Sequence, residues 1–128
     1  MPAAASIGVY LVSVETVRRS LAGHGDRYLA RIFTRREVED SLAAGSVSAA
    51  RLAARFAAKE AAMKALRVPA TEGIPWRSIE LVRDEDGSMR LRLTGRAARL
   101  AARRGLRELS VGVTQEAGFA AAVVLALP

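Results

Sequence analysis

The stretch that decides the fold class is Ser48-Ala-Ala-Arg-Leu-Ala-Ala-Arg-Phe-Ala-Ala-Lys-Glu-Ala-Ala-Met-Lys-Ala-Leu66. It is rich in alanine and contains no glycine or proline, so it predicts the longest helix of the chain. An apolar stripe follows one side of this helix and consists of Leu52, Phe56, Met63 and Leu66. We expect the stripe to pack against a sheet, with this helix at the centre of the fold.

Shorter elements precede and follow the long helix. Alternation and β-branched runs predict strands at residues 7–12, 79–82, 89–93, 109–114 and 119–127. Helical spacing predicts further helices at residues 15–21 (ended by Gly23 and Gly25), 28–33, 34 to about 45, and 96–104. Because strands and helices mix without regular β-α-β alternation, we expect an α+β fold with a mainly antiparallel sheet.

Three local signals support these boundaries. Thr34 is followed three residues later by Glu37, which is a capping box at a helix start. Residues 84–87 read Asp-Glu-Asp-Gly and predict a hairpin turn between two strands. Thr94 and Gly105 are placed as the start and stop of the last helix.

Length and composition exclude several classes of protein. A chain of 128 residues is expected to form a single domain, residues 1–128. The absence of cysteine excludes disulfides and thiolate chemistry, and a single histidine, His24, leaves carboxylates as metal ligands, which excludes a zinc enzyme. Residues 1–5 lack the basic start and apolar core of a signal peptide, so we expect a soluble cytoplasmic protein with no membrane segment.

The net charge of +7 favours an anionic partner. A positive surface raises the local concentration of a phosphorylated small molecule, an acidic protein or RNA. Aromatic residues make up only 5% of the chain and do not alternate with basic ones, so nucleic acid is the least favoured of these partners.

The two lysines of the chain, Lys59 and Lys64, both lie in the long helix beside Glu60, whereas all other cations are arginines. One interpretation is an ordinary pair between Glu60 and Lys64, with the Lys59 stem running along apolar surface to reach water. The other is that both positions need a compact ammonium, which suits phosphate oxygens.

The segment Arg55-Phe56-Ala57-Ala58-Lys59-Glu60-Ala61, followed by Lys64-Ala65-Leu66, resembles the signature helix of the holo-acyl-carrier-protein synthases, the small phosphopantetheinyl transferases. Residues 24–34, 76–81, 84–87 and 95–98 are similar to other segments of that family, in the same order. The resemblance covers nearly the whole chain and implies the phosphopantetheinyl transferase fold.

The resemblance also implies a function. Family members of this size form homotrimers with the active site between subunits, and they move 4'-phosphopantetheine from coenzyme A to a serine of an apo acyl carrier protein. Their magnesium ion is held by a first-strand aspartate, the signature glutamate and the coenzyme's diphosphate. Glu60 matches the glutamate, and Lys64 matches the lysine that neutralises the leaving nucleotide phosphate.

The same comparison assigns further residues. Coenzyme A or phosphopantetheine is expected to contact Lys59, Lys64, Arg55 and Thr114. The acidic carrier protein is expected to dock on Arg18, Arg19, Arg27 and Arg31. His24 lies in a helical segment far along the chain from the expected site, and we expect its role to be structural.

Two substitutions fall at the centre of the expected site. Tyr10 stands where the family has its metal aspartate, and Val113 stands where it has an active-site histidine. A phenol is a poorer and bulkier magnesium ligand than a carboxylate, so Glu60 alone is expected to bind the metal weakly or not at all. Because losing one positioned group costs roughly 100- to 1000-fold in rate, we expect a degenerate member with little or no transfer.

Such a member would bind an acyl carrier protein or a pantetheine thioester carried on one. Two alternatives stay open. The first is an active transferase in which a water or a substrate phosphate replaces the lost ligand. The second is a scaffold or a repurposed enzyme acting on carrier-bound acyl chains, in a pocket made apolar by Tyr10 and Val113.

Overall fold

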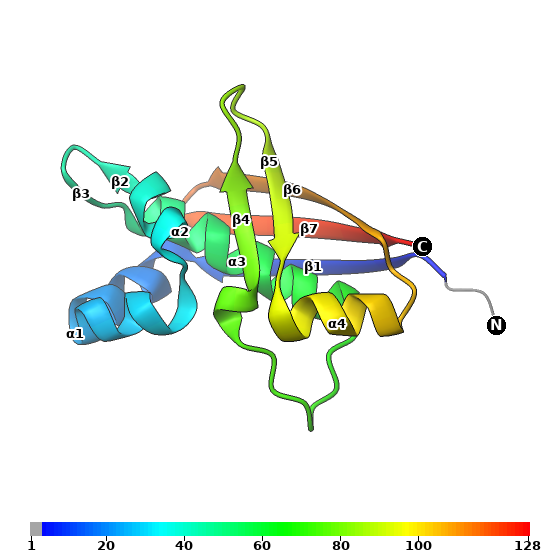
Figure 1. Ribbon diagram of the computed structural model, residues 1–128. Coiled ribbons are helices and arrows are strands. Elements are labelled where there is room, and N and C mark those ends of the chain that lie inside the picture. The colour runs from blue at the N-terminus through cyan, green and yellow to red at the C-terminus, as the bar shows by residue number, and fades with distance from the viewer. Residues whose placement is uncertain (1–3) are drawn as a thin grey trace.

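Helix α3 (Ala49–Ala65) is the predicted long helix and lies at the centre of the computed structural model, which describes residues 4–128 (Figure 1). Ser48 caps its start by accepting a hydrogen bond from the Arg51 backbone amide at 3.2 Å. Residues 1–3, part of the stretch expected not to form a signal peptide, lie outside the described residues.

The remaining elements surround α3. In chain order they are β1 (Ser6–Ser13), α1 (Val14–Ile32), α2 (Arg35–Asp40), β2 (Leu42–Ala43), β3 (Ser46–Val47), the 3-10 turn η1 (Trp76–Ser78), β4 (Ile79–Arg83), β5 (Met89–Leu93), α4 (Gly95–Arg103), β6 (Glu108–Glu116) and β7 (Phe119–Leu127). One sheet has the order β1-β7-β6, and β4-β5 and β2-β3 form two hairpins. Every pairing is antiparallel, which confirms the predicted α+β class.

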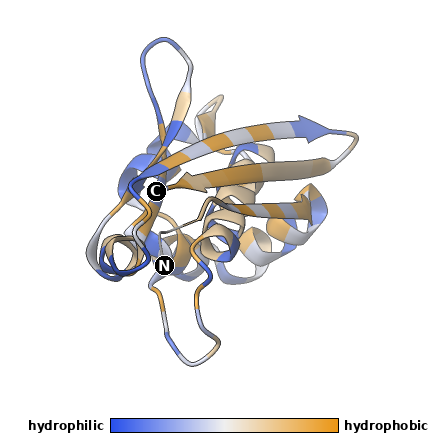
Figure 2. Cartoon of the chain, turned by 90° about the vertical axis from the view of Figure 1, so that its right-hand side faces the viewer, coloured by the Kyte–Doolittle hydropathy of each residue, from blue (hydrophilic) through white to orange (hydrophobic). Residues whose placement is uncertain are grey.

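Alternation along the three-stranded sheet divides its side chains between two faces. The inner face packs on α3 and includes the buried residues Val12, Ala120, Ala122 and Val124. The outer face carries exposed apolar side chains: Ile7, Val9 and Leu11 from β1, and Phe119, Val123 and Leu125 from β7. Apolar colouring runs along the strands of this sheet in Figure 2. An outward apolar face of this extent is typical of an interaction surface.

Gly8 sets the distance between β1 and α3. A Cβ atom at this position would fall 1.9 Å from the Ala61 carbonyl oxygen and 2.8 Å from the Ala65 amide nitrogen. Real side chains do not tolerate such contacts with backbone atoms. The alanine-rich face of α3 and this glycine together let the strand lie directly on the helix.

One predicted helix is longer than the observed one. The helix expected from Thr34 to about Gly45 ends at Asp40, because the chain turns into the β2–β3 hairpin, whose turn residues Ala44 and Gly45 have φ of 52° and 83°. Such left-handed pairs are typical of two-residue hairpin turns. The helices expected at 15–21 and 28–33 lie on either side of a kink within α1, where Gly25 has the non-helical angles φ 49° and ψ −121°, so the break predicted at the two glycines is confirmed.

Helix α4 begins and ends close to the residues that the sequence predicts. Thr94 precedes the helix, although its side chain makes no capping hydrogen bond, and Gly105 follows it with φ of 70°. None of the helices within residues 4–128 combines the length and apolar character that crossing a bilayer requires.

We predict that Gly8→Ala lowers the free energy of unfolding by about 2 to 3 kcal/mol, because the added methyl group meets backbone atoms of α3 that cannot rotate away. Denaturant unfolding followed by circular dichroism measures the change. Gly23→Ala is the matched control: nothing lies within 4 Å of its Cβ position, and it should stabilise by about 0.5 to 1 kcal/mol. If the two variants changed the free energy of unfolding equally, the close contact between Gly8 and the α3 backbone would be contradicted.

Candidate active site

Tyr10, Glu60 and Lys64 meet where β1 crosses α3. Tyr10 lies on the face of β1 directed at the helix, and its ring contacts Phe56 edge-on with 6.0 Å between centroids. The Lys64 ammonium lies over the same Tyr10 ring, 5.2 Å from its centroid. It also donates a hydrogen bond to the Val9 carbonyl oxygen at 3.3 Å. Lys64 is therefore held by β1 through a ring face and a carbonyl.

Burial shapes the electrostatics of this cluster. Desolvation raises the pKa of the half-buried Glu60 carboxyl, and the positive charge of Lys64 opposes that rise. Desolvation also raises the pKa of the Tyr10 phenol, and the negative charge of Glu60 adds to the effect. The phenol consequently stays protonated at neutral pH and acts as a neutral hydrogen-bond donor.

Val113 lies on the same face of the sheet as Tyr10. Both residues pair with Ala122, Tyr10 from β1 and Val113 from β6, so the three form one cross-strand row. Val113 is partly buried against the core cluster. Strand β7 with the small side chain of Ala122 thus separates the two positions.

The Glu60 carboxylate is the magnesium ligand that this crossing offers. Glu60 supplies a carboxylate, but Tyr10 supplies a protonated phenol and the Val9 carbonyl already accepts from Lys64. Within residues 4–128 there is no group of three or more histidine, cysteine, aspartate or glutamate side chains placed to hold a metal ion. Magnesium prefers several oxygen ligands in octahedral geometry, so the ligands besides Glu60 would have to be water or substrate phosphate oxygens.

Lys59, one residue before Glu60 and so about 100° away around α3, is fully buried. Its ammonium forms an ion pair with Glu37 at 2.6 Å, donates to the Trp76 carbonyl at 3.1 Å, and donates to the Ile79 carbonyl. Burial lowers the pKa of Lys59, and the Glu37 charge opposes that shift. All three ammonium protons thus have an acceptor inside the protein.

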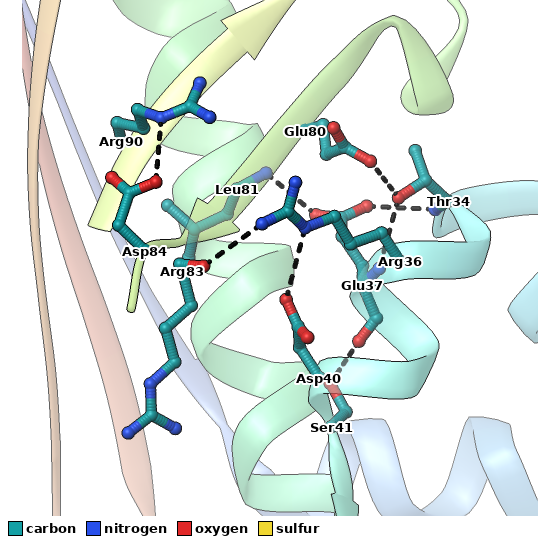
Figure 3. Close-up of polar contacts among 10 residues, drawn as sticks. All are labelled: Thr34, Arg36, Glu37, Asp40, Ser41, Glu80, Leu81, Arg83, Asp84 and Arg90. Atoms are coloured by element: carbon teal, nitrogen blue, oxygen red, sulfur yellow. Dashed lines mark hydrogen bonds and ion pairs between the residues drawn. The ribbon is translucent and has the colours of Figure 1, made fainter. Parts of the chain in front are cut away.

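Glu37 is equally buried and equally satisfied. Its carboxylate accepts from the Thr34 backbone amide at 3.0 Å, as the capping box predicts, and from the Leu81 amide of β4 at 3.0 Å. Figure 3 shows Glu37 between Thr34 and Leu81. The Lys59–Glu37 pair therefore joins α2, α3, η1 and β4.

A groove of about 640 Å³ lies between α1 and the start of η1. Arg27, Arg31 and His24 line it from α1, while Phe56 and Trp76 form an aromatic wall, stacked with 5.3 Å between ring centroids. Phe56 contacts Trp76 on one side and Tyr10 on the other. Phe56 thus lies between the groove and the Tyr10–Lys64 cluster.

The chain is similar in sequence and in fold to known proteins. A sequence model described as the 4'-phosphopantetheinyl transferase superfamily matches residues 6–124. The holo-acyl-carrier-protein synthase of Halorhodospira halophila is 39% identical over 121 residues, covering 94% of this chain and 95% of that protein. That of Moorella thermoacetica is 41% identical over 118 residues, covering 92% of this chain and 90% of that protein.

This chain belongs to the holo-acyl-carrier-protein synthase family. The synthase of Neisseria meningitidis has the same fold, with a TM-score of 0.83, 28% identity, and coverage of 96% of this chain and 98% of that one. The synthase–coenzyme A complex of Chronobacterium ammoniagenes gives a TM-score of 0.81 at 27% identity, covering 97% of both chains.

Within this family fold, two expected cofactor contacts need correction. Lys59 cannot present its ammonium to a ligand, because Glu37 and two carbonyls enclose it. Arg55 is also buried: it donates to the Arg51 carbonyl at 3.0 Å, its Nε has no partner, and burial lowers its pKa against the opposing charge of Asp40. Helical periodicity placed both residues on α3 correctly but did not show what packs opposite them.

Other expected residues of the synthase fold are separated in space. Thr114 lies on the outer face of the sheet, on the opposite side from Tyr10 and Val113, because neighbouring residues of a strand alternate. The four arginines of α1 also fall into two groups. Arg27 and Arg31 line the groove, whereas Arg18 and Arg19 both pair with Glu15.

Sequence reasoning missed two features of this groove. Trp76 was assigned to a family segment and Phe56 to the apolar stripe, and neither was expected to line a surface groove. The lone histidine, His24, which was expected to be structural, lies in the groove wall. Gly23 and Gly25 indicated in the sequence that the helix breaks here, but the angle between the two parts of α1 cannot be predicted from a sequence.

We predict that Lys59→Met lowers the free energy of unfolding by about 3 to 5 kcal/mol, because it leaves the Glu37 carboxylate buried without its counter-ion. Lys64→Met is the matched control, since the Lys64 side chain is exposed, and it should change stability by less than about 0.5 kcal/mol. Urea unfolding at neutral pH compares the two variants. Similar losses for both would show that Lys59 is not a buried partner of Glu37.

Proposed function

We propose that this protein transfers 4'-phosphopantetheine from coenzyme A to a serine of an apo acyl carrier protein. The observation that carries the proposal is the near full-length relationship to holo-acyl-carrier-protein synthases at 39% and 41% identity. The meeting of Glu60 and Lys64 at an accessible crossing of β1 and α3 supports it. So does the coenzyme A held by the related synthase of the same fold.

In this reaction the serine oxygen forms a bond to the β-phosphorus of coenzyme A. The bond from that phosphorus to the bridging oxygen of the nucleotide phosphate breaks, and adenosine 3',5'-bisphosphate leaves. Glu60 would accept the serine proton, and the raised pKa of its carboxyl would make it a better base than an exposed glutamate. The Lys64 ammonium neutralises the charge that develops on the leaving phosphate.

The intact mass of an apo acyl carrier protein, measured after incubation with this protein, coenzyme A and magnesium, tests the proposal. We expect the carrier mass to increase by one phosphopantetheine group, at a rate comparable to that of an authentic synthase run beside it. An unmodified carrier, with the control reaction complete, would refute transfer. Glu60→Gln should lower the rate by roughly 100-fold or more, because the proton acceptor is lost.

A second candidate function is binding of the carrier protein with little or no transfer. Tyr10 and Val113 favour it, since they replace the aspartate and histidine that the family resemblance leads us to expect. The double variant Tyr10→Asp/Val113→His separates the two candidates in the same assay. A degenerate protein should gain roughly 100-fold or more in rate, whereas an active one should change little.

We further propose that the acidic carrier protein docks along the groove beside α1. Arg27 and Arg31 supply positive charge at this groove, and Phe56 and Trp76 supply an apolar surface between α1 and η1. Arg18 and Arg19 contribute less to docking, because Glu15 offsets their charge. The positive charges of Arg27 and Arg31 beside the aromatic wall suit an acidic, amphipathic helix.

Arg27→Glu should abolish retention of the carrier protein in a pull-down and weaken binding at least roughly tenfold, because a repulsive charge replaces an attractive one at the groove. Arg99→Glu makes the same charge change at an exposed position on α4 and serves as the control. If both variants retain the carrier equally, it docks elsewhere.

We also propose that three copies assemble through the outer face of the β1-β7-β6 sheet. The apolar residues of β1 and β7 on this face are between 38% and 63% exposed in the single chain, which is costly unless another surface covers them. Assembly here would place Thr114, which lies on this same face, at the boundary between copies. The active site between subunits that the family resemblance implies agrees with that position.

Val123→Asp should convert the assembly to a monomer, because it buries a charge at the centre of the apolar face. Light scattering coupled to size-exclusion chromatography measures the mass. Leu42→Asp is the control, since Leu42 is comparably exposed but lies on the β2–β3 hairpin. A wild-type protein that runs as a monomer at all concentrations would rule out the assembly.

A further inference from the structure

We propose that Tyr10 positions the Lys64 ammonium as the resident cation of the site, so that a phosphate-bearing ligand binds beside Glu60 without a divalent metal ion. The inference rests on the proposed function for its ligand, coenzyme A. It goes beyond that function by assigning a positioning role to Tyr10 and by removing the metal requirement.

The position of Lys64 is fixed by two contacts from β1. The Tyr10 ring face lies 5.2 Å from Nζ, within the range of a cation–π interaction, and the Val9 carbonyl accepts one ammonium proton at 3.3 Å. An ammonium has three protons, so the remaining ones are available to phosphate oxygens. A flexible lysine without these contacts would lose side-chain entropy on binding the ligand.

Tyr10 is itself held in place. Phe56 packs edge-on against its ring, and two residues earlier Gly8 lies in direct contact with the α3 backbone. The backbone of Tyr10 is therefore fixed relative to α3, and Phe56 supports the ring from one side. Because Lys64 lies one helical turn after Glu60, the same ring keeps the cation on the Glu60 side of the crossing.

The charges of Tyr10, Glu60 and Lys64 are the reason that a diphosphate is expected to bind here without a metal ion. A carboxylate at position 10 together with Glu60 would repel a diphosphate, and a dication would have to offset that repulsion. With a protonated phenol at position 10, the negative charge of Glu60 is matched by the positive charge of Lys64.

The first experiment needs no ligand. Aromatic ring currents should shift the Lys64 ε-methylene protons upfield in the NMR spectrum of wild-type protein. Tyr10→Phe should preserve the shift, because it keeps the ring, and Tyr10→Leu should remove it. Lys59, buried in another part of α3, provides an internal reference that neither variant should move. An unshifted Lys64 signal in wild-type protein would overturn the positioning role of Tyr10.

The second experiment titrates the full-length protein with coenzyme A by calorimetry, once with excess magnesium and once with a chelator. We expect the two dissociation constants to agree within about twofold, and Tyr10→Leu to weaken binding by roughly 2- to 30-fold in both buffers while Tyr10→Phe does not. Tyr10→Asp should make binding depend on magnesium, by roughly tenfold or more.

The outcomes separate this inference from the proposed function. Coenzyme A that binds wild-type protein only with magnesium overturns the inference and leaves transfer from coenzyme A intact. Coenzyme A that binds in neither buffer overturns the donor assignment and the inference together. Equal loss of affinity in Tyr10→Phe and Tyr10→Leu would show that the hydroxyl group, and not the ring, matters, which also overturns the positioning role.

Discussion

The buried ion pair between Lys59 and Glu37 is the interaction on which the arrangement of this protein depends. It joins α3 to the capping box of α2, to the η1 turn and to β4, and all of its polar atoms are satisfied inside the fold. Such a pair contributes little net stability compared with apolar packing, but it strongly penalises any arrangement that leaves one partner unpaired. Because Lys59 donates to the Trp76 carbonyl, the pair also fixes the aromatic wall of the groove.

Much of the fold follows from the sequence because its signals are local. The alanine-rich α3, the Thr34–Glu37 capping box and the 84–87 turn depend on neighbouring residues, and the structure contains all three. The length of α2 could not be predicted, since no glycine, proline or change of apolar pattern marks its end at Asp40, and the left-handed Ala44–Gly45 turn belongs to the hairpin that follows. Local patterns identify elements better than they identify boundaries.

The site was predictable in part. Family resemblance placed Tyr10, Glu60 and Lys64 in one site, and they do meet at the β1–α3 crossing. Lys59 and Arg55, which were expected to contact the cofactor, are buried in the structure, and periodicity shows which residues share a helix face but not whether Glu37 or solvent lies opposite. Thr114 follows Val113 directly in sequence and yet lies on the other face of the sheet, which depends on strand register. The groove could not be predicted from local sequence patterns, because its walls come from α1, α3 and η1.

The contact of Gly8 with the backbone of α3 has a consequence for how this family can diversify. A strand anchored in this way cannot slip by one residue, because a neighbour with a side chain would then meet the Ala61 carbonyl. Position 10 is therefore held at a constant place above the helix whatever residue occupies it. Exchange of an acidic for an aromatic side chain there alters the charge and hydration of the site while the backbone stays where it is. Evolution can thus vary the chemistry at this position separately from the architecture that supports it.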